Sequence, residues 1–323
     1  MTTTDTQWTE RLANIVPANF MNNTSNTYQV AAGFLENMID RIGRTVIMGQ
    51  RNVYDPFSKW ADPVMDFGNA IQKYCVPFIE GNTPDYDPAD PNPYKTVKTH
   101  PEAQYITFND DVQYKQTLFN LMLKKAFESP SSFGSFTAEL TGTMYKSAGL
   151  DRYLKWKKYL SKTDYLNATN GIKTVEYTNN DEYGYALWQQ IKDLVTDKMK
   201  YPTKDFNKYG MMSASPSFDV VITTEAKNMI DASLKGVYNL EKVAIPNINI
   251  MEVDSFATVD GQDSPLDVVI LSTGMAHYTP RSPESGALYN PENYYTNLWY
   301  KEAGAFAFDP WYNAAQIYRK AAA

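Results

Sequence analysis

Only two histidines, His100 and His277, could act as general bases or metal ligands near neutral pH in this chain of 323 residues. They are far apart in sequence and lie in proline-flanked or loop-like contexts. A Ser/His/Asp triad needs a histidine held by a carboxylate, and a histidine-rich metal site needs several ring nitrogens together. We therefore expect neither a catalytic residue nor a metal site at either histidine.

Carboxylates suggest two further kinds of chemistry. Asp110 and Asp111 are adjacent and could be taken for the acid pair of a glycosidase. Asp85, Asp87 and Asp90 are close together, and carboxylate oxygens are the ligands that Ca²⁺ prefers. The spacing of these three lacks the glycine and the distal glutamate of an EF-hand loop. Solvated acidic side chains are therefore the better interpretation of all five residues.

Motifs for nucleotide binding and for redox chemistry are missing from the sequence. It contains no GxxxxGK(S/T) and no GxGxxG segment, and hence no recognisable phosphate-binding loop. Cys75 is the only cysteine, which excludes an intramolecular disulfide and any CxxC motif. We expect the protein to use no cofactor.

A run of basic side chains favours a contact with nucleic acid, because lysine and arginine neutralise phosphates. These residues are Arg152, Lys155, Lys157, Lys158 and Lys162. The more general explanation is that cations near the C-terminal end of a helix are stabilised by the helix dipole. A net charge of −7 also argues against a protein whose main task is to bind nucleic acid, so any DNA contact should be weak.

The basic run ends the longest segment that can form one helix, residues 133–162. Apolar side chains recur there at intervals of three and four, which places them along one face of a helix. They are Phe133, Phe136, Leu140, Met144, Ala148, Tyr153, Trp156 and Leu160. At 1.5 Å per residue this helix would be about 45 Å long, which is typical of a scaffold element.

The part before this helix is predicted to be extended. Residues 1–27 are polar and form an arm, residues 28–42 fit a short amphipathic helix, and residues 44–53 fit a strand. Two strand-like arms, 64–79 and 104–118, flank a segment whose prolines exclude helix and central strand. We expect a long two-stranded loop with an exposed tip, which leans on another subunit because an isolated hairpin is marginally stable.

The part after the long helix predicts a compact α/β lobe followed by aromatic strands. We expect helices over 181–200 and 225–238, strands over 218–223, 248–253 and 266–271, and returning strands within 294–318. Leu187, Ile191, Leu194 and Val195 should face inward from the first of these helices. Thr224 is the expected cap of the second helix.

This order of elements resembles the major capsid protein of tailed bacteriophages, the Hong Kong 97-type fold, and more narrowly that of small short-tailed phages of the phi-29 kind. Short segments carry the resemblance, and their order over residues 28–318 makes it persuasive. They are residues 40–43 (DRIG) with 46–47 (VI), Phe136 with 144–148 (MYKSA), 220–234, 253–257 (VDSFA), and 294–300 leading to 313–315 (NAA).

The resemblance implies an α+β chain with an N-terminal arm, an extended β-hairpin loop, a peripheral domain with a long spine helix, and an α/β axial domain. The implied boundaries are 1–53 for the arm and the start of the peripheral domain and 54–118 for the extended loop. Residues 119–164 would form the peripheral domain with the spine helix, 165–290 the axial domain, and 291–323 the C-terminal strands of the peripheral domain.

The function that the resemblance implies is structural: a major capsid protein, with no catalytic site, that assembles into an icosahedral shell around a double-stranded DNA genome. Implied partners are copies of itself in hexamers and pentamers, a scaffolding protein, a portal protein and packaged DNA held by weak non-specific contacts. The protein would be located in the capsid of the virion, which would be assembled in the host cytoplasm. The sequence has no uninterrupted apolar stretch long enough to cross a membrane, so no membrane partner is expected.

The aromatic composition agrees with a shell subunit, because tyrosine and tryptophan anchor large protein interfaces. The chain has 24 tyrosines, 15 phenylalanines and 6 tryptophans. Candidate contacts between subunits are Trp60, Phe67, Tyr86, Tyr94, Trp299 and Trp311. The candidates for DNA contact are the five basic residues of the long helix. Two alternatives stay open: an encapsulin-like compartment shell and, less favoured, a carbohydrate-active enzyme that uses Asp110 or Asp111.

Overall fold

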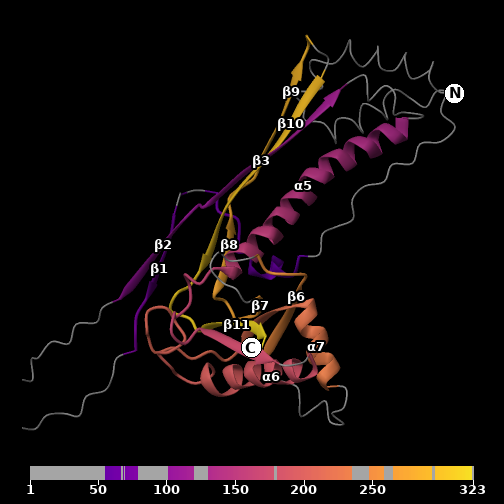
Figure 1. Cartoon of the computed structure of the whole chain (residues 1–323). Helices are drawn as coiled ribbons and strands as arrows, with labels where there is room; N and C mark the ends of the chain where they lie inside the picture. The colour runs from indigo at the N-terminus through magenta and orange to yellow at the C-terminus, as the bar shows by residue number, and fades with distance from the viewer. Residues whose placement is uncertain are drawn as a thin grey trace, which may run out of the picture.

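The computed structural model describes residues 55–66, 68, 70–78, 101–119, 130–177, 180–234, 247–257, 265–292 and 295–321. These residues form an elongated molecule, with a lobe at one end and a long sheet and helix that extend away from it (Figure 1). The predicted N-terminal arm, with its helix at 28–42 and its strand at 44–53, lies outside the described residues, and so does the proline-rich tip of the loop.

The predicted long helix is confirmed as α5, Pro130–Ser161. Proline is favoured in the first turn of a helix, because its fixed φ suits the helix and its missing N–H would have no partner there. Met144, Ala148, Trp156 and Leu160 of the predicted apolar face are buried.

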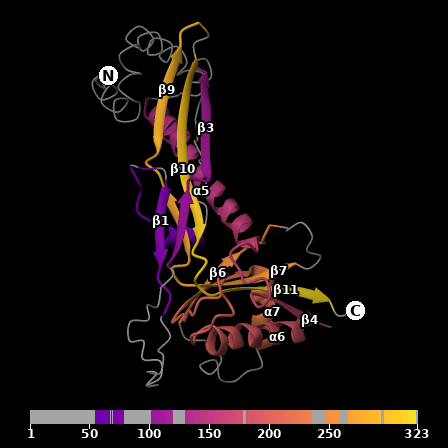
Figure 2. The ribbon, with the colours of Figure 1, turned by 90° about the vertical axis from the view of Figure 1, so that its left-hand side faces the viewer.

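A four-stranded antiparallel sheet runs beside α5 (Figures 1 and 2). Its central strand is β10, Tyr295–Phe308. One edge of β10 pairs with β3, Asp110–Phe119, and the other edge pairs in turn with β9, Glu284–Asn290, and β8, Ala276–Pro280. The helix packs on this sheet through Tyr300, whose ring lies 4.6 Å from that of Tyr145 between centroids.

The predicted two-stranded loop is present but shorter than its sequence suggests. Strands β1, Ala70–Cys75, and β2, Glu102–Thr107, pair antiparallel and project from the molecule (Figure 1). Residues 110–119 do not continue this hairpin, because they pair with β10 as strand β3. A sequence pattern of period two identifies a strand without identifying its neighbour, so it does not show where the second arm of the loop ends.

The lobe is built on a five-stranded mixed sheet with the order β4-β11-β7-β5-β6. The strands are β4 (Ile172–Tyr177), β5 (Phe218–Thr223), β6 (Ile248–Val253), β7 (Leu266–Ser272) and β11 (Ala314–Ala321). Three helical segments accompany it: α6 (Asn180–Lys192), the π-helical turn η2 (Asp193–Lys198) and α7 (Thr224–Leu234). The helices and strands predicted for the lobe are thus present, and all four predicted inward residues of α6 and η2 are buried.

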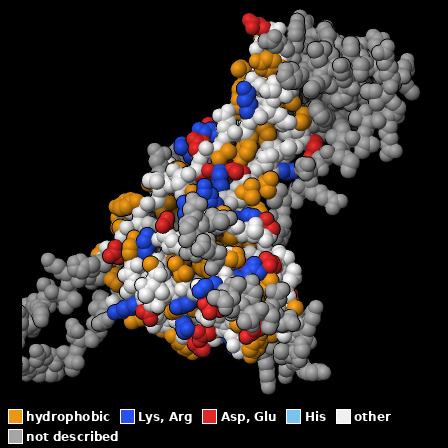
Figure 3. Space-filling model, viewed as in Figure 1, with side chains coloured by type: hydrophobic (Ala, Val, Ile, Leu, Met, Phe, Trp, Pro, Cys, Tyr) orange, Lys and Arg blue, Asp and Glu red, His pale blue; other side chains and the backbone are white. Residues whose placement is uncertain are grey.

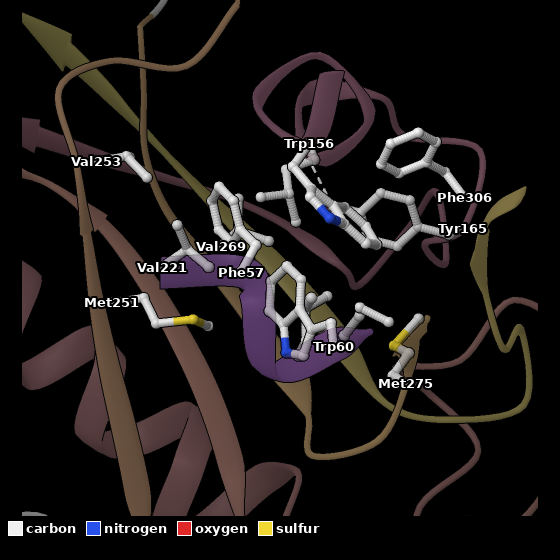
Figure 4. Close-up of a cluster of buried hydrophobic side chains, with 14 of the residues drawn as sticks. Phe57, Trp60, Trp156, Tyr165, Val221, Met251, Val253, Val269, Met275 and Phe306 are labelled. Carbon is white, nitrogen blue, oxygen red and sulfur yellow. Dashed lines mark hydrogen bonds between the residues drawn. The ribbon is translucent and has the colours of Figure 1, made fainter. Parts of the chain in front are cut away.

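Both faces of this sheet are covered, which explains its continuous apolar strands. Val220 and Ile222 point to the side of α6 and α7, whereas Val221 points to the opposite side. On that opposite side the sheet meets the 3-10 helix η1, Pro56–Trp60, and the end of α5, as Figure 4 shows. The rings of Trp60 and Trp156 meet there edge to face at 4.9 Å between centroids.

The strand pairing corrects two predicted domain boundaries. Strand β11 lies between β4 and β7 in the lobe, so residues 314–321 are not part of the four-stranded sheet around β10. Strands β8 and β9 pair with β10, so residues 276–290 belong to that four-stranded sheet and not to the lobe. Both errors have one physical cause: strands far apart in sequence pair through backbone hydrogen bonds that the side-chain pattern does not record.

The cap of α7 also differs by one residue from the prediction. The amide of Ala226 donates to Thr223 Oγ1 at 3.3 Å, whereas Thr224 Oγ1 donates to the carbonyl of Val253 at 3.2 Å. Thr223 therefore caps the helix, and Thr224 ties the helix start to β6.

Candidate subunit interface

The outer face of the hairpin is apolar, aromatic and exposed. Tyr74 of β1 is 64% exposed, and Tyr105 of β2, which lies on the same face of the hairpin as Tyr74, is 66% exposed. Val76 and Phe78, in the segment that follows β1, are 67% and 76% exposed. Hydrophobic side chains are visible on the left of the coloured part of the molecule in Figure 3, where Figure 1 places β1 and β2. We call Tyr74, Val76, Phe78 and Tyr105 the hairpin patch.

The two tyrosines of the hairpin patch are held in place by one side chain. Gln72 Nε2 lies 2.5 Å from Tyr105 Oη and also contacts Tyr74 Oη. Gln72 stands directly opposite Tyr105 in the strand register. The phenol rings thus present a preformed surface, which lowers the entropy cost of ordering them against a partner.

The inner face of the hairpin attaches it to the body of the molecule. Ile106 is buried against Ala305 and Ala307, and Ile71 packs beside them. Lys73 Nζ lies 2.8 Å from Asp309 Oδ1, next to the end of β10. The two faces therefore differ in role, since one is occupied within the subunit and the other is open.

Three of the five basic residues predicted to contact DNA form ion pairs within the subunit. Arg152 lies 3.1 Å from Glu302, Lys155 lies 2.6 Å from Asp110 and 2.5 Å from Asp151, and Lys157 lies 2.7 Å from Asp254. These pairs fasten α5 to β3, to β10 and to the segment after β6. Lys158 is exposed, and Lys162 lies 4.6 Å above the ring of Tyr159, so these two are the candidates best placed for an external phosphate.

The ion pairs of α5 shift the pKa of the carboxylates in opposite directions. Burial raises the pKa of Asp110 although Lys155 acts to lower it. At Asp254 burial also acts to raise the pKa, but hydrogen bonds from Lys157 and Tyr153 outweigh it and lower the pKa to about 2. The difference follows exposure, because the Asp254 side chain is 66% exposed and that of Asp110 only 13%.

Two of the predicted aromatic anchors are core residues, which corrects their assignment to an interface. Trp60 is 5% exposed and donates from Nε1 to Asp219 Oδ2 at 2.8 Å, and Trp311 is 8% exposed. Their side chains are occupied inside the subunit. Trp299 is partly exposed, with Lys115 Nζ 5.8 Å from its ring centroid. Phe67, Tyr86 and Tyr94 lie outside the described residues.

The predicted contacts between subunits include none of the four residues of the hairpin patch. The signal was present in the alternation of residues 70–78, AIQKYCVPF, in which every second residue could face outward. The sequence does not show which face of the hairpin is the inner one. That depends on the contacts of Ile71 and Lys73 with β10 and the segment after it.

The carboxylates considered for hydrolysis do not converge. Asp110 and Asp111 are successive residues of β3 and so point to opposite faces of the sheet. Asp110 pairs with Lys155, and Asp111 lies 3.3 Å from Lys301. Asp85, Asp87, Asp90 and His100 lie outside the described residues, whereas His277 is a residue of β8 and not of a loop.

Among the described residues no group of three or more His, Cys, Asp or Glu side chains is arranged to hold a metal ion. No helix in the same part of the chain combines the length and the apolar character needed to span a membrane.

Comparison with known sequences gives one family. The family model described as "Phi29-like phage major capsid protein" matches residues 2–318. The major capsid protein of Streptococcus phage Cp-1 is 25% identical over 83% of this chain and 77% of its own length. That of Bacillus phage B103 is 25% identical over 86% of this chain, but the match spans only 64% of the relative.

Comparison with solved structures gives the same fold. A chain of the capsid of Staphylococcus phage Andhra superposes with a TM-score of 0.63 at 10% identity, covering 87% of this chain and 88% of that one. A chain of the capsid of cyanophage P-SCSP1u gives a TM-score of 0.60 at 7% identity, over 87% and 92% of the two chains. At these identities the likeness concerns the fold, which is the Hong Kong 97-type fold of phage capsid proteins.

Proposed function

This chain belongs to the phi29-like family of phage major capsid proteins, and from that membership we propose how its surfaces build the shell. It is a major capsid protein that forms the capsid shell. The comparisons support neither an encapsulin-like compartment nor a carbohydrate-active enzyme. The sheet of β3, β8, β9 and β10 with α5 serves as the peripheral domain. The lobe serves as the axial domain, which meets its copies in hexamers and pentamers.

The observation that carries the proposal is the hairpin patch. Two tyrosines on the outer face of the projecting hairpin and two apolar side chains just after β1 are all more than half exposed. A monomeric protein gains nothing from such a surface, and contiguous exposed apolar patches mark interaction sites. The occupant is a neighbouring copy of this chain, since shell subunits contact one another on all sides. The hairpin patch thus stabilises the contact between neighbours.

Further partners are part of the same proposal. A scaffolding protein and a portal protein would direct assembly in the host cytoplasm, and the shell would enclose double-stranded DNA. Lys158 and Lys162 at the end of α5 are the proposed DNA contacts. Trp299 on β10 is a proposed contact between subunits. The masking of Arg152, Lys155 and Lys157 by carboxylates supports a weak contact with DNA, because few cations are left to neutralise phosphates.

A double substitution tests the hairpin patch. Replacing Tyr74 and Tyr105 by serine removes two rings whose loss at an interface centre costs about 2 kcal/mol or more each. We expect the purified subunit to keep its circular dichroism spectrum and its unfolding midpoint, but to yield few shells in electron micrographs and sedimentation.

The matched control replaces the same two tyrosines by phenylalanine, which keeps the apolar area and loses only the hydroxyl groups. This variant should form shells at close to the wild-type yield. Normal shells from the serine variant would disprove the assignment of the hairpin patch to an interface.

A further inference from the structure

The connection between η2 and β5 is a surface loop that buried hydrogen bonds hold in one shape, and we call residues 199–213 the lysine loop. Two backbone hydrogen bonds of 2.9 Å join Thr203 to Ser213. Asn313, which is fully buried just before β11, donates from Nδ2 to the carbonyl oxygens of Met199 and Ser213 at 3.2 and 3.1 Å. The lysine loop is therefore preformed, so a partner can bind it at little cost in conformational entropy.

The outward side of the lysine loop combines aromatic rings with cations. Tyr201 is 59% exposed, Tyr209 is 50% exposed and Met212 is 37% exposed. Exposed lysines recur there at every fourth position: Lys200, Lys204 and Lys208. Among the described residues neither Lys200 nor Lys208 forms an ion pair. Exposed apolar side chains that lie together mark interaction sites, and here they lie among positive charges.

The charge of the lysine loop is opposite to that of the chain as a whole. Residues 199–213 contain three lysines and one aspartate, a net charge of +2, whereas the chain has a net charge of −7. The lysine loop therefore favours an acidic partner, and a second copy of this chain is acidic. The exposed rings argue against a DNA backbone as the partner, because binding to phosphates depends on cations and gains nothing from apolar area.

One segment of the chain matches both properties of the lysine loop. Residues 80–94, EGNTPDYDPADPNPY, contain four carboxylates, four prolines and no lysine or arginine. Carboxylates pair with lysine, and proline-rich segments bind to exposed aromatic side chains because their backbone is already restricted before binding. The segment begins two residues after Phe78 of the hairpin patch. It is thus the part of the chain that continues the hairpin patch.

We propose that the lysine loop of one subunit binds residues 80–94 of a second copy. This inference rests on the proposed function, in which the hairpin patch lies against a neighbour. The hairpin projects from its own body, and the 26 residues between β1 and β2 allow a reach of about 40 Å beyond it, at about 3.3 Å per residue along each arm (Figure 1). Residues 80–94 extend the contact from the hairpin patch onto the lobe of that neighbour.

A fluorescein-labelled peptide of residues 80–94 tests this recognition without assembly. We expect the full-length, unassembled subunit to bind the peptide, as measured by fluorescence anisotropy. The triple variant Lys200→Gln, Lys204→Gln, Lys208→Gln should bind it about tenfold more weakly, because three exposed ion pairs together are worth about that factor.

Two controls separate this contact from general charge attraction. Lys115→Gln with Lys301→Gln removes exposed cations from the four-stranded sheet and should leave peptide binding unchanged. A peptide with Asp85→Asn, Asp87→Asn and Asp90→Asn should bind the wild type about tenfold more weakly. Absence of peptide binding, or an equal loss in the lysine control, would overturn the proposal. So would a DNA duplex whose binding depends on the lysines of the lysine loop when peptide binding does not.

An exchange of charges shows which copy supplies the segment. One variant combines Lys200→Glu, Lys204→Glu and Lys208→Glu, and the other combines Asp85→Lys, Asp87→Lys and Asp90→Lys. Each variant alone should keep the unfolding midpoint of the unassembled subunit and yield about tenfold fewer shells than wild type. An equal mixture of the two should recover shells, because each segment then meets the opposite charge on the other variant.

Two outcomes of the exchange would overturn the proposal. Normal shells from either variant alone would show that the two segments make no contact. Recovery only when both sets of substitutions are in one chain would show that residues 80–94 bind the lobe of their own subunit. The peptide measurement needs no shell, so a failure of the hairpin patch in assembly would leave its result intact.

Discussion

Asp219 shows how much a single buried carboxylate can organise at the junction of the lobe and the hairpin base. It is 2% exposed and accepts hydrogen bonds from Trp60 Nε1 at 2.8 Å, Lys59 Nζ at 3.0 Å and Asn249 Nδ2 at 3.0 Å. Its three donors come from η1 and β6, so this one side chain fixes the segment that leads to the hairpin against two strands of the lobe.

Replacing Asp219 by alanine should lower the free energy of unfolding by about 1–3 kcal/mol, because the indole N–H of the buried Trp60 would lose its acceptor. The midpoint and slope of urea unfolding measure this loss. Lys59→Met is the control, since the lysine side chain is 38% exposed and an exposed pair contributes at most about 1 kcal/mol. An equal loss in both variants would show that the Asp219 charge, and not its buried hydrogen bonds, stabilises the junction.

Helices α6 and α7 touch at a glycine, and this contact sets their distance. A Cβ added at Gly184 would lie 2.2 Å from the carbonyl oxygen of Met229 and 2.3 Å from Ser233 Oγ. The first of these atoms belongs to the backbone of α7, so it cannot move without moving the helix. Only a residue without a side chain permits this approach.

Gly184→Ala should therefore destabilise the lobe by about 1–3 kcal/mol or more, the cost of overpacking a closely packed contact. Thermal unfolding of the purified subunit measures the effect. Gly142→Ala on α5 is a matched control, because nothing lies within 4 Å of its added Cβ and alanine favours a helix by about 1 kcal/mol. If Gly184→Ala were as stable as wild type, the two helices would have to be free to separate.

Predictability from the sequence was highest for single elements. The ends of α5, β5, β6 and β7 lie within a few residues of their predicted positions, because apolar spacing and breakers act locally. The pairing of β3 with β10 and the insertion of β11 were not predictable in this way. The predicted interface role of Trp60 was wrong for the same reason. Trp60 is buried because η1 packs on β5 and β6, and the local sequence pattern does not record that contact.

At the scale of the molecule, the cations of α5 fall into two sets. Arg152, Lys155 and Lys157 form ion pairs within the subunit, whereas Lys158 and Lys162 are exposed. Lys158→Glu with Lys162→Glu should reduce the DNA retained by assembled particles and leave shell yield unchanged, because these cations hold no carboxylate among the pairs described for α5. The ratio of absorbance at 260 and 280 nm in purified particles measures retention. A loss of shells with normal DNA content would instead place this end of α5 in a subunit contact.

Lys155→Met serves as the control for that experiment. It removes a cation that already pairs with Asp110 and Asp151, so it should lower subunit stability and leave DNA retention per particle unchanged. The burial that raises the pKa of Asp110 would then act without its partner, and the carboxylate would take up a proton more readily than in the wild type.

Strand β11 lies between β4 and β7, yet it follows every other strand of the lobe in chain order. During synthesis on a ribosome, β4 therefore has no neighbour to pair with until residue 321 has left the exit tunnel. The lobe cannot complete its sheet before that moment, and any product truncated earlier exposes two unpaired strand edges. Because this late strand is an internal one, we expect chains that lack it to leave the sheet of the lobe incomplete and therefore not to enter the shell.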